Sequence, residues 1–341
     1  MKVLTFGEIL LRLASPGYTR LFQKDRLDAT FCGSEANVAV SLAMFGADVS
    51  FLTKVLADDV GRAAISSLRY FGVDTSKTIY GEGRMGLYYL EKGASQRPSK
   101  VIYDRSCTAM SLAQRNNFNW DEIFKDVDWF HWSGIDPALS TNMAEICMDA
   151  CLAAKKRGIT VSCDLNYRKK LWSSGEAQST MVRLMPYVDV CIANEEDADQ
   201  VLGIKNPYSD VENGVVDKNG YVLVAQEICH RYGCKVVAIT LRESCSASAN
   251  GWEAMLYDAA TDTSFFSKKY YIQLVDRVGG GDSFAAGIIY GLISKKDKQY
   301  VIEFAVAASC LKQTMEGDYN RTTVQEVEYL MASNGSGRIQ R

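Results

Sequence analysis

Histidine is scarce in this sequence, since only His131 and His230 occur among its 341 residues. The ten cysteines contain no C-x-x-C pair and no Cys/His spacing of the kind that binds zinc, which excludes the common zinc motifs. These cysteines are scattered, mostly through apolar runs. We therefore expect buried free thiols in a reducing compartment.

Long apolar runs are also absent, and none approaches the length needed to span a membrane. The apolar N-terminus is interrupted by Glu8 and Arg12 before a signal-peptide core forms. The formal net charge is −3, which gives no electrostatic reason to expect binding to nucleic acid or to an anionic membrane. We therefore expect a cytoplasmic protein that has neither nucleic acid nor a membrane as a partner.

The rest of the composition is ordinary for a globular protein, with 47% hydrophobic and 23% charged residues. The length allows one large domain or two unequal ones, with a sizeable core. Apolar runs that predict strands alternate with longer segments that predict helices, which implies crossover connections and a mostly parallel sheet. Predicted strands cover residues 3–6, 49–54, 128–133, 160–164, 188–193 and 236–241, with a closing antiparallel pair at 252–257 and 265–271. Predicted helices cover residues 32–45, 60–71, 143–157, 195–202, 222–232, 304–314 and 324–331.

Residues 75–105 break this rhythm. Tyr-rich, alternating segments at 87–91 and 100–103 are separated by polar loops, which predicts an antiparallel excursion from the α/β chain. Such a sheet is too small to be stable alone, so we expect it to cover a site as a lid or to form a dimer contact. Tyr88, Tyr103 and Arg105 belong to it, although exposed surface positions are an equally ordinary interpretation of such residues.

Three consecutive glycines, Gly279, Gly280 and Gly281, precede Asp282 and an apolar helix that extends to Ile293. Backbone N–H groups at such a helix start form a cradle for an anion, most often a phosphate. An acid inside the cradle suits a base that accepts a proton from a hydroxyl group, and a helix cap is the simpler alternative. We expect the helix N-terminus to lower the pKa of Asp282.

Two other glycine motifs are excluded for this loop. Phe284 stands where a dinucleotide-binding fingerprint has its third glycine. No Gly-Lys-Ser/Thr follows, as a P-loop would require.

Four motifs occur in order along the chain: Gly-Ser-Glu-Ala-Asn at 33–37, Asp-Leu-Asn-Tyr-Arg at 164–168, Asn-Glu-Glu-Asp at 194–197 and Asp-Arg-Val-Gly-Gly-Gly-Asp-Ser-Phe at 276–284. Together with the Tyr-rich segment, they resemble the ribokinase-like (PfkB) superfamily of sugar kinases over nearly the whole chain. Residues 86–105 are similar, more narrowly, to the 2-keto-3-deoxygluconate kinases. The resemblance implies a three-layer α/β/α ribokinase-like fold with a mostly parallel central sheet and a small β-sheet lid. It implies a kinase domain over residues 1–331, lid strands at about 10–32 and 75–105, and a C-terminal tail at 332–341.

The same resemblance implies roles for individual residues, with ATP and Mg²⁺ as cofactors and a homo-oligomer formed through the lid. Asp282 would be the catalytic base, and the N–H groups of Gly279, Gly280, Gly281 and Asp282 would form the anion hole. Substrate would contact Gly33, Ser34, Glu35, Asn37, Tyr88, Tyr103, Arg105, Asn166, Arg168 and Asp282. The nucleotide would contact Asn194, Thr240, Arg242, Glu243, Ser246, Gly279 and Gly281, and Asp197 would meet magnesium through water.

The sequence departs from the family pattern at three of these positions. Gly280 replaces the usual alanine, Asp197 replaces a glutamate, and Arg242 stands where many relatives have glycine. The role of Arg242 is the one that this leaves open.

The resemblance implies phosphorylation of 2-keto-3-deoxygluconate at its terminal (6-) hydroxyl, giving 2-keto-3-deoxy-6-phosphogluconate. A substrate carboxylate calls for a guanidinium group, and Arg105 and Arg168 are the candidates, with no acidic partner fixed by sequence spacing. Two alternatives remain: a fructokinase or another neutral-sugar kinase, and a non-catalytic sugar-binding regulatory protein.

Overall fold

The computed structural model describes residues 1–194, 196–208 and 217–333. Within these residues the central sheet has nine strands. They are β1 (Lys2–Phe6), β4 (Asp48–Leu52), β9 (Trp129–Ser133), β10 (Thr160–Asp164), β11 (Val190–Ala193), β12 (Val236–Ser246), β13 (Ala249–Asp258), β14 (Thr263–Phe266) and β15 (Tyr270–Gln273). Their order is β14-β13-β12-β11-β10-β9-β1-β4, with β15 paired to β13.

Most of this sheet is parallel, as the alternating sequence pattern predicts. Strands β4, β1, β9, β10, β11 and β12 are mutually parallel. The antiparallel part is confined to one edge, where β13 pairs with β12, β14 and β15. The parallel strands therefore bring their carboxyl ends to the same edge of the sheet, where ligands of α/β proteins collect.

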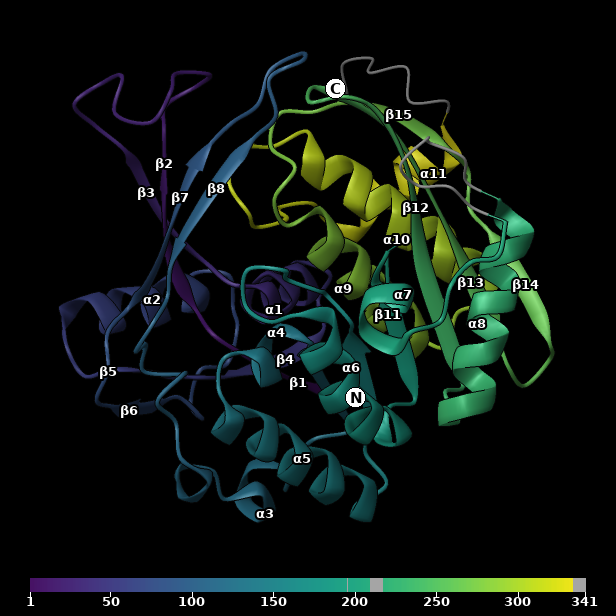
Figure 1. Ribbon diagram of the computed structural model, residues 1–341, viewed down its shortest axis with the longest axis horizontal. Helices are drawn as coiled ribbons and strands as arrows, with labels where there is room; N and C mark the ends of the chain where they lie inside the picture. The colour runs from purple at the N-terminus through teal and green to yellow at the C-terminus, as the bar shows by residue number, and fades with distance from the viewer. Residues whose placement is uncertain (195, 209–216, 334–341) are drawn as a thin grey trace.

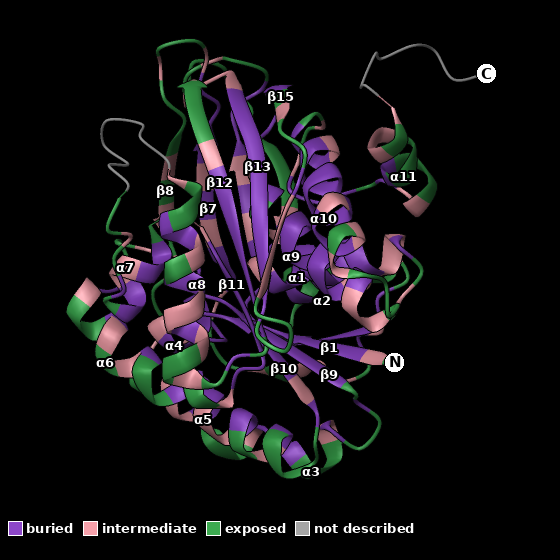
Figure 2. Cartoon of the chain, turned by 90° about the vertical axis from the view of Figure 1, so that its right-hand side faces the viewer, coloured by how far each residue is buried: buried purple, intermediate pink, exposed green. Residues whose placement is uncertain are grey.

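Helices cover both faces of the sheet and give three layers (Figure 2). One face carries α1 (Ser34–Met44), α2 (Asp59–Arg69), α9 (Gly280–Ile293), α10 (Lys298–Gln313) and α11 (Val324–Ala332). The other carries α3 (Trp120–Ile123), α4 (Ile135–Ala138), α5 (Thr141–Lys156), α6 (Ser174–Leu184), α7 (Asp197–Leu202) and α8 (Lys218–Tyr232). Successive strand side chains enter opposite cores: Val237 and Ile239 pack in one cluster, and Val236 and Ala238 in the other.

A second sheet projects from one side of the body (Figure 1). It has the order β3-β2-β7-β8 and consists of β2 (Leu10–Ala14), β3 (Asp28–Cys32), β7 (Gly86–Glu91) and β8 (Lys100–Asp104). The predicted antiparallel pairing of β7 with β8 is confirmed, and β2 adds to β7 in parallel. The excursion at 75–105 is therefore half of a sheet that the N-terminal segment completes.

Several predicted boundaries were wrong. The predicted strand at 49–54 ends at Leu52, and Lys54 instead begins β5 (Lys54–Leu56), which pairs with β6 (Ile79–Gly81). The predicted strand at 265–271 is two strands, β14 and β15. Helix α6 was not predicted at all. The predicted helix start at residue 195 and the tail beyond residue 333 lie outside the described residues.

The structure also shows the state of the cysteines and whether a helix is long and apolar enough to span a membrane. All ten cysteines lie in the described part of the chain as free thiols, and seven of them are buried. None of the described helices combines the length and the apolar character needed to cross a membrane.

Candidate active site

A cavity of about 840 Å³ lies where the carboxyl ends of the parallel strands face the glycine loop and the second sheet. Predicted substrate residues from three segments line it. They include Gly33 and Ser34 at the start of α1, Tyr88 and Tyr103 in the second sheet, and Asn166 and Arg168 after β10. Glu35, Asn37, Arg105, Asn194, Asp197, Thr240, Arg242, Ser246, Gly279, Gly280, Gly281 and Asp282 line it as well. Glu243 is the exception among the predicted residues, because it is exposed and its carboxylate pairs with Lys269 at 2.6 Å.

The glycine loop opens α9 and faces the cavity. Gly279 has φ +82°, and a side chain on it would overlap the backbone carbonyl of Asp318, so only glycine fits. An alanine at Gly280, the usual family residue, would come about 3.0 Å from the side chain of Gln313, which requires only a small shift. The Gly280 N–H donates to Arg277 O at 3.2 Å, whereas the N–H groups of Gly281 and Asp282 have no acceptor among the described residues. Two unsatisfied donors at a helix start are suited to hold an anion.

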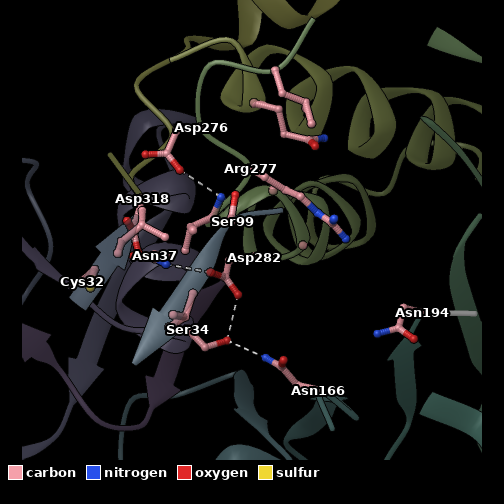
Figure 3. A pocket seen from close by; sticks show the side chains of 18 of the residues that line it. Cys32, Ser34, Asn37, Ser99, Asn166, Asn194, Asp276, Arg277, Asp282 and Asp318 are labelled. Atoms are coloured by element: carbon pink, nitrogen blue, oxygen red, sulfur yellow. Dashed lines mark hydrogen bonds between the residues drawn. The ribbon is translucent and has the colours of Figure 1, made fainter. Parts of the chain in front are cut away.

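The carboxylate of Asp282 is held by side chains of α1 (Figure 3). Ser34 Oγ donates to Asp282 Oδ1 at 2.8 Å, and Asn37 Nδ2 donates to Oδ2 at 2.7 Å. Asn166 Nδ2 in turn donates to Ser34 Oγ at 2.9 Å. Helix α9 has Gly279 as its N-cap with no side-chain capping bond, so Asp282 does not serve as a helix cap.

The predicted direction of the Asp282 pKa shift was wrong. Burial raises the pKa of Asp282, while the hydrogen bonds from Asn37 and Ser34 and the charge of Arg168 lower it in part. The loss of hydration around the carboxylate therefore outweighs the hydrogen bonds and the positive charge that favour its ionised form. A raised pKa brings the group closer to the range in which a general base works well.

The second sheet turns alternate side chains toward the cavity. Leu10, Tyr88, Leu90, Val101 and Tyr103 line the cavity from this face. The rings of Tyr88 and Tyr103 lie 5.9 Å apart. The hydroxyl of Tyr88 donates to Asp318 Oδ2 at 2.6 Å, so Tyr88 presents its ring rather than its hydroxyl.

A buried ion-pair cluster joins this sheet to the glycine loop. Arg12 in β2 pairs with both Asp276 and Asp318, and all three side chains are nearly inaccessible. Lys312 Nζ donates to Asp276 O at 3.0 Å, which adds a second buried cation. In the sequence Arg12 only argues against a signal peptide, and no local pattern indicates this role. A buried arginine can be recognised only once its partners are known, because burial without pairing is costly.

Arg105 has an acidic partner, Glu8, which sequence spacing did not indicate. Its Nε and Nη2 donate to Glu8 Oε2 at 3.0 and 2.5 Å, and both side chains are under 10% exposed, at 8% and 4%. Nη1 makes no hydrogen bond within the described residues, and Arg105 is one of the residues that line the cavity. Asp104, the residue next to Arg105 in the chain, pairs with Arg84 instead.

Arg168 keeps its charge available. Its Nη1 donates to the carbonyl of Tyr167 at 3.0 Å, and no carboxylate of the described residues forms an ion pair with it. It is half-buried, and its charge lowers the pKa of both Asp164 and Asp282, which burial raises. A guanidinium group with these surroundings is available to a bound anion.

The predicted nucleotide residues line the opposite part of the cavity. Asn194 Oδ1 accepts from the N–H groups of Glu196 and Asp197 at 2.8 and 3.1 Å, so its amide nitrogen is left for a ligand. Asp197 is buried, and its two oxygens accept from the N–H groups of Tyr167 and Asn194. Arg242 Nε donates to Ser244 Oγ at 3.1 Å.

Metal ligands are not concentrated at one point. No group of three or more His, Cys, Asp or Glu side chains that could hold a metal ion occurs in the described part of the chain. Asp197 is already engaged by two backbone amides, so it suits an indirect contact through water better than direct coordination.

Glu35 is a buried residue that lines the cavity. Its carboxylate packs against Gly7, where a side chain would overlap it. Burial raises the pKa of Glu35 to about 7. Gly33, the N-cap of α1, donates its N–H to Asn37 Oδ1 at 3.4 Å.

Known proteins resemble this chain in sequence and in fold. Residues 1–324 match the family described as pfkB family carbohydrate kinase. The crystal structure of a 2-dehydro-3-deoxygluconokinase from Thermotoga maritima is 48% identical with a TM-score of 0.93, covering 98% of this chain and 100% of that one. A 2-dehydro-3-deoxygalactonokinase from Haloferax volcanii is 31% identical over 339 residues, 98% of each chain. A 2-dehydro-3-deoxygluconokinase from Bacillus subtilis is 26% identical over 332 residues, 96% of this chain and 94% of its own. The chain therefore belongs to the pfkB family of carbohydrate kinases and is an ATP-dependent sugar kinase.

Proposed function

We propose that this kinase phosphorylates 2-keto-3-deoxygluconate (2-dehydro-3-deoxygluconate) at its terminal 6-hydroxyl and forms 2-keto-3-deoxy-6-phosphogluconate. The observation that carries the proposal is the unpaired guanidinium of Arg168 in the same cavity as Asp282. A neutral sugar gives such a charge no partner, whereas a carboxylate matches its planar fork. The names of the relatives support a sugar acid as the substrate.

In the proposed reaction the 6-hydroxyl oxygen forms a bond to the γ-phosphorus of ATP. The bond between that phosphorus and the β,γ-bridging oxygen breaks, its electron pair stays on the bridging oxygen, and ADP leaves. Asp282 accepts the hydroxyl proton, and the free N–H groups of Gly281 and Asp282 stabilise the charge on the transferring group. Ser34 and Asn37 hold both oxygens of the base in place.

Magnesium would enter with the phosphates of ATP and supply charge neutralisation there. The donors present fit this arrangement, because Asp197 and Asn194 reach the cavity without forming a cage of carboxylates. Thr240, Arg242 and Ser246 would lie along the nucleotide. Glu243 is directed to Lys269 in this structure, so we assign it no contact with ATP.

The sugar acid would lie between α1, β10 and the second sheet. Its carboxylate would meet Arg168 and the free Nη1 of Arg105, while Gly33, Glu35, Asn166, Tyr88 and Tyr103 surround the carbon chain. The test is ADP release by the purified enzyme with ATP and a panel of 2-keto-3-deoxygluconate, 2-keto-3-deoxygalactonate, gluconate, fructose and ribose. We expect the highest kcat/KM on 2-keto-3-deoxygluconate. Preference for fructose or ribose would make it a neutral-sugar kinase, and no turnover on any sugar would favour a binding protein.

The hydrogen bond from Asn37 predicts a pH effect. Asp282 acts as a base only when ionised, so activity falls as the pH drops through its pKa. Burial raises this pKa and the Asn37 bond lowers it. Replacing Asn37→Ala removes the lowering contribution, so the acid limb of the kcat/KM profile should move to higher pH. The profile would be measured across roughly pH 5 to 9, with Asn166→Ala as a control that contacts Ser34 rather than Asp282. An unmoved acid limb in Asn37→Ala would reduce Asn37 to a structural contact.

We further propose that residues 1–331 form one kinase domain with residues 10–32 and 75–105 as its lid, and that the lid pairs with that of a second copy of this chain. The face of the second sheet opposite the cavity is apolar. Leu11, Phe31 and Leu87 on this face pack against the main core, whereas Leu13, Tyr89 and Ile102 are partly or fully exposed and form no part of it. Apolar side chains left open to water at this end of a four-stranded sheet favour a partner that covers them.

The Ile102→Glu substitution tests this contact. Ile102 is 40% exposed in the single chain, so the substitution should spare the monomer but place a charge in the paired interface. Sedimentation velocity should show at least about tenfold weaker self-association, with Tyr271→Glu as a control at an exposed aromatic outside the lid. A fully active wild-type monomer at assay concentration would refute the shared lid.

A further inference from the structure

We propose that Arg277 is a catalytic residue that contacts the phosphoryl group in transfer. It lies in the connection between β15 and α9, two residues before Gly279. Its side chain lines the cavity, and Figure 3 shows the guanidinium extending from this loop into the open cavity on the side of Asn194. The inference rests on the proposed phosphoryl transfer, and it assigns a residue for which the family resemblance implies no role.

The neighbouring residue fixes the direction in which Arg277 points. Asp276 is buried, and its carboxylate is held by Arg12 and by the N–H groups of Val278 and Gly317. The Arg277 carbonyl accepts from the Gly280 N–H at 3.2 Å, which closes the turn. With the backbone held on both sides, the Arg277 side chain is directed away from the buried cluster. Arg277 is exposed and lines the cavity, so its guanidinium group is open to a ligand.

Arg277 has no acidic partner in the part of the chain that the structure describes. Three other cations of the cavity region are neutralised by carboxylates: Arg12 by Asp276 and Asp318, Arg105 by Glu8, and Lys92 by Glu316. Arg277 makes no hydrogen bond or ion pair through its side chain among the described residues. An exposed arginine on an outer surface needs no partner, since water solvates it. One that lines a cavity beside free N–H donors is placed to meet an anion.

The anion that fits is the γ-phosphoryl group, because Arg277 lies in the same loop as the N–H groups that would hold it. The free N–H groups of Gly281 and Asp282 follow Arg277 by four and five residues in the same loop, whereas Arg168 follows β10 and serves the sugar carboxylate. In the transfer, the bond to the β,γ-bridging oxygen breaks while the sugar oxygen bonds to phosphorus, and negative charge spreads over the phosphoryl oxygens and the leaving oxygen. A guanidinium group stabilises this charge distribution, as arginines of other phosphoryl-transfer enzymes do.

The test compares Arg277→Ala and Arg277→Lys with wild type and with Arg183→Ala, an exposed arginine paired with Glu145 outside the cavity. We expect Arg277→Ala to lower kcat about 10- to 100-fold with little change in the KM for sugar. Guanidinium chloride at tens of millimolar should restore part of the kcat that Arg277→Ala loses. It should not raise the kcat of Arg183→Ala or of Asp282→Asn. Arg277→Lys should lie between wild type and Arg277→Ala, since it keeps the charge without the fork.

A binding measurement without sugar separates this inference from the proposed function. In the presence of Mg²⁺, calorimetry would compare ADP with an ATP analogue whose β,γ-bridge is an imido group. Arg277→Ala should weaken binding of the analogue about tenfold and that of ADP less than about twofold. Equal weakening of both ligands, or of neither, would overturn the assignment. If the wild type phosphorylates no sugar acid, the proposed function fails, and the calorimetric comparison still decides the role of Arg277.

Discussion

The Asp282→Asn substitution is expected to lower kcat by roughly a hundredfold or more, while the affinities for sugar and ATP stay within a few-fold of wild type. The substitution keeps the shape of the side chain and removes only its capacity to accept the hydroxyl proton. The amide also fits the hydrogen-bond environment. Its oxygen can accept from Asn37 Nδ2, and its nitrogen can donate to Ser34 Oγ, which already accepts from Asn166. The loss would therefore report on proton transfer rather than on misfolding.

Single-turnover kinetics with ATP and 2-keto-3-deoxygluconate measure this loss directly, because they separate the chemical step from product release. Calorimetric binding of ATP and of the sugar acid is the control. A near wild-type rate in Asp282→Asn would exclude Asp282 as the base and would leave the glycine loop as a binding element only. Loss of sugar binding together with the rate would show instead that Asp282 mainly holds the substrate.

The parallel sheet and the glycine loop could be predicted from sequence because both depend on local patterns. Short apolar runs bounded by turns predict buried strands, and the run at 160–164 coincides with β10. Helix α6 had a local signal that was overlooked: Ser173 and Glu176 form a capping box, and Ala177, Met181 and Leu184 lie on one buried face. Strand β3 has no such signal, because it has only five residues and three of them, Asp28, Ala29 and Thr30, are exposed.

The ion pairs of the site could not be predicted, because sequence spacing identifies partners only within a helix turn or a hairpin. Glu8 is 97 positions from Arg105, and Arg12 is 264 positions from Asp276. The predicted direction of the Asp282 pKa shift was wrong for the same reason. The helix N-terminus was visible in the sequence, whereas the burial of the carboxylate depends on segments that are far apart along the chain.

Arg168→Ala should separate a sugar-acid kinase from a neutral-sugar kinase. Truncating a charge that meets a desolvated carboxylate costs about 2–5 kcal/mol, mostly because the other charge is left unpaired. This corresponds to a loss of roughly 30-fold to several thousand-fold in kcat/KM on 2-keto-3-deoxygluconate. Activity on fructose should change far less, since fructose has no carboxylate. Both substrates must be measured on the same variant, because a misfolded protein would lose both activities together.

Arg168 is a sharper test of the carboxylate contact than Arg105. Arg105→Ala would leave the buried carboxylate of Glu8 unpaired, which typically destabilises a protein by about 3–5 kcal/mol, so lost activity could follow from unfolding. Arg168 has no ion-pair partner to leave behind within the described residues, and its side chain is only half-buried. The neighbouring exposed lysine supplies the matched control, Lys169→Ala, which removes one positive charge outside the set of cavity-lining residues. Equal losses on acid and neutral sugar in Arg168→Ala would remove the carboxylate contact and leave the neutral-sugar kinase as the better assignment.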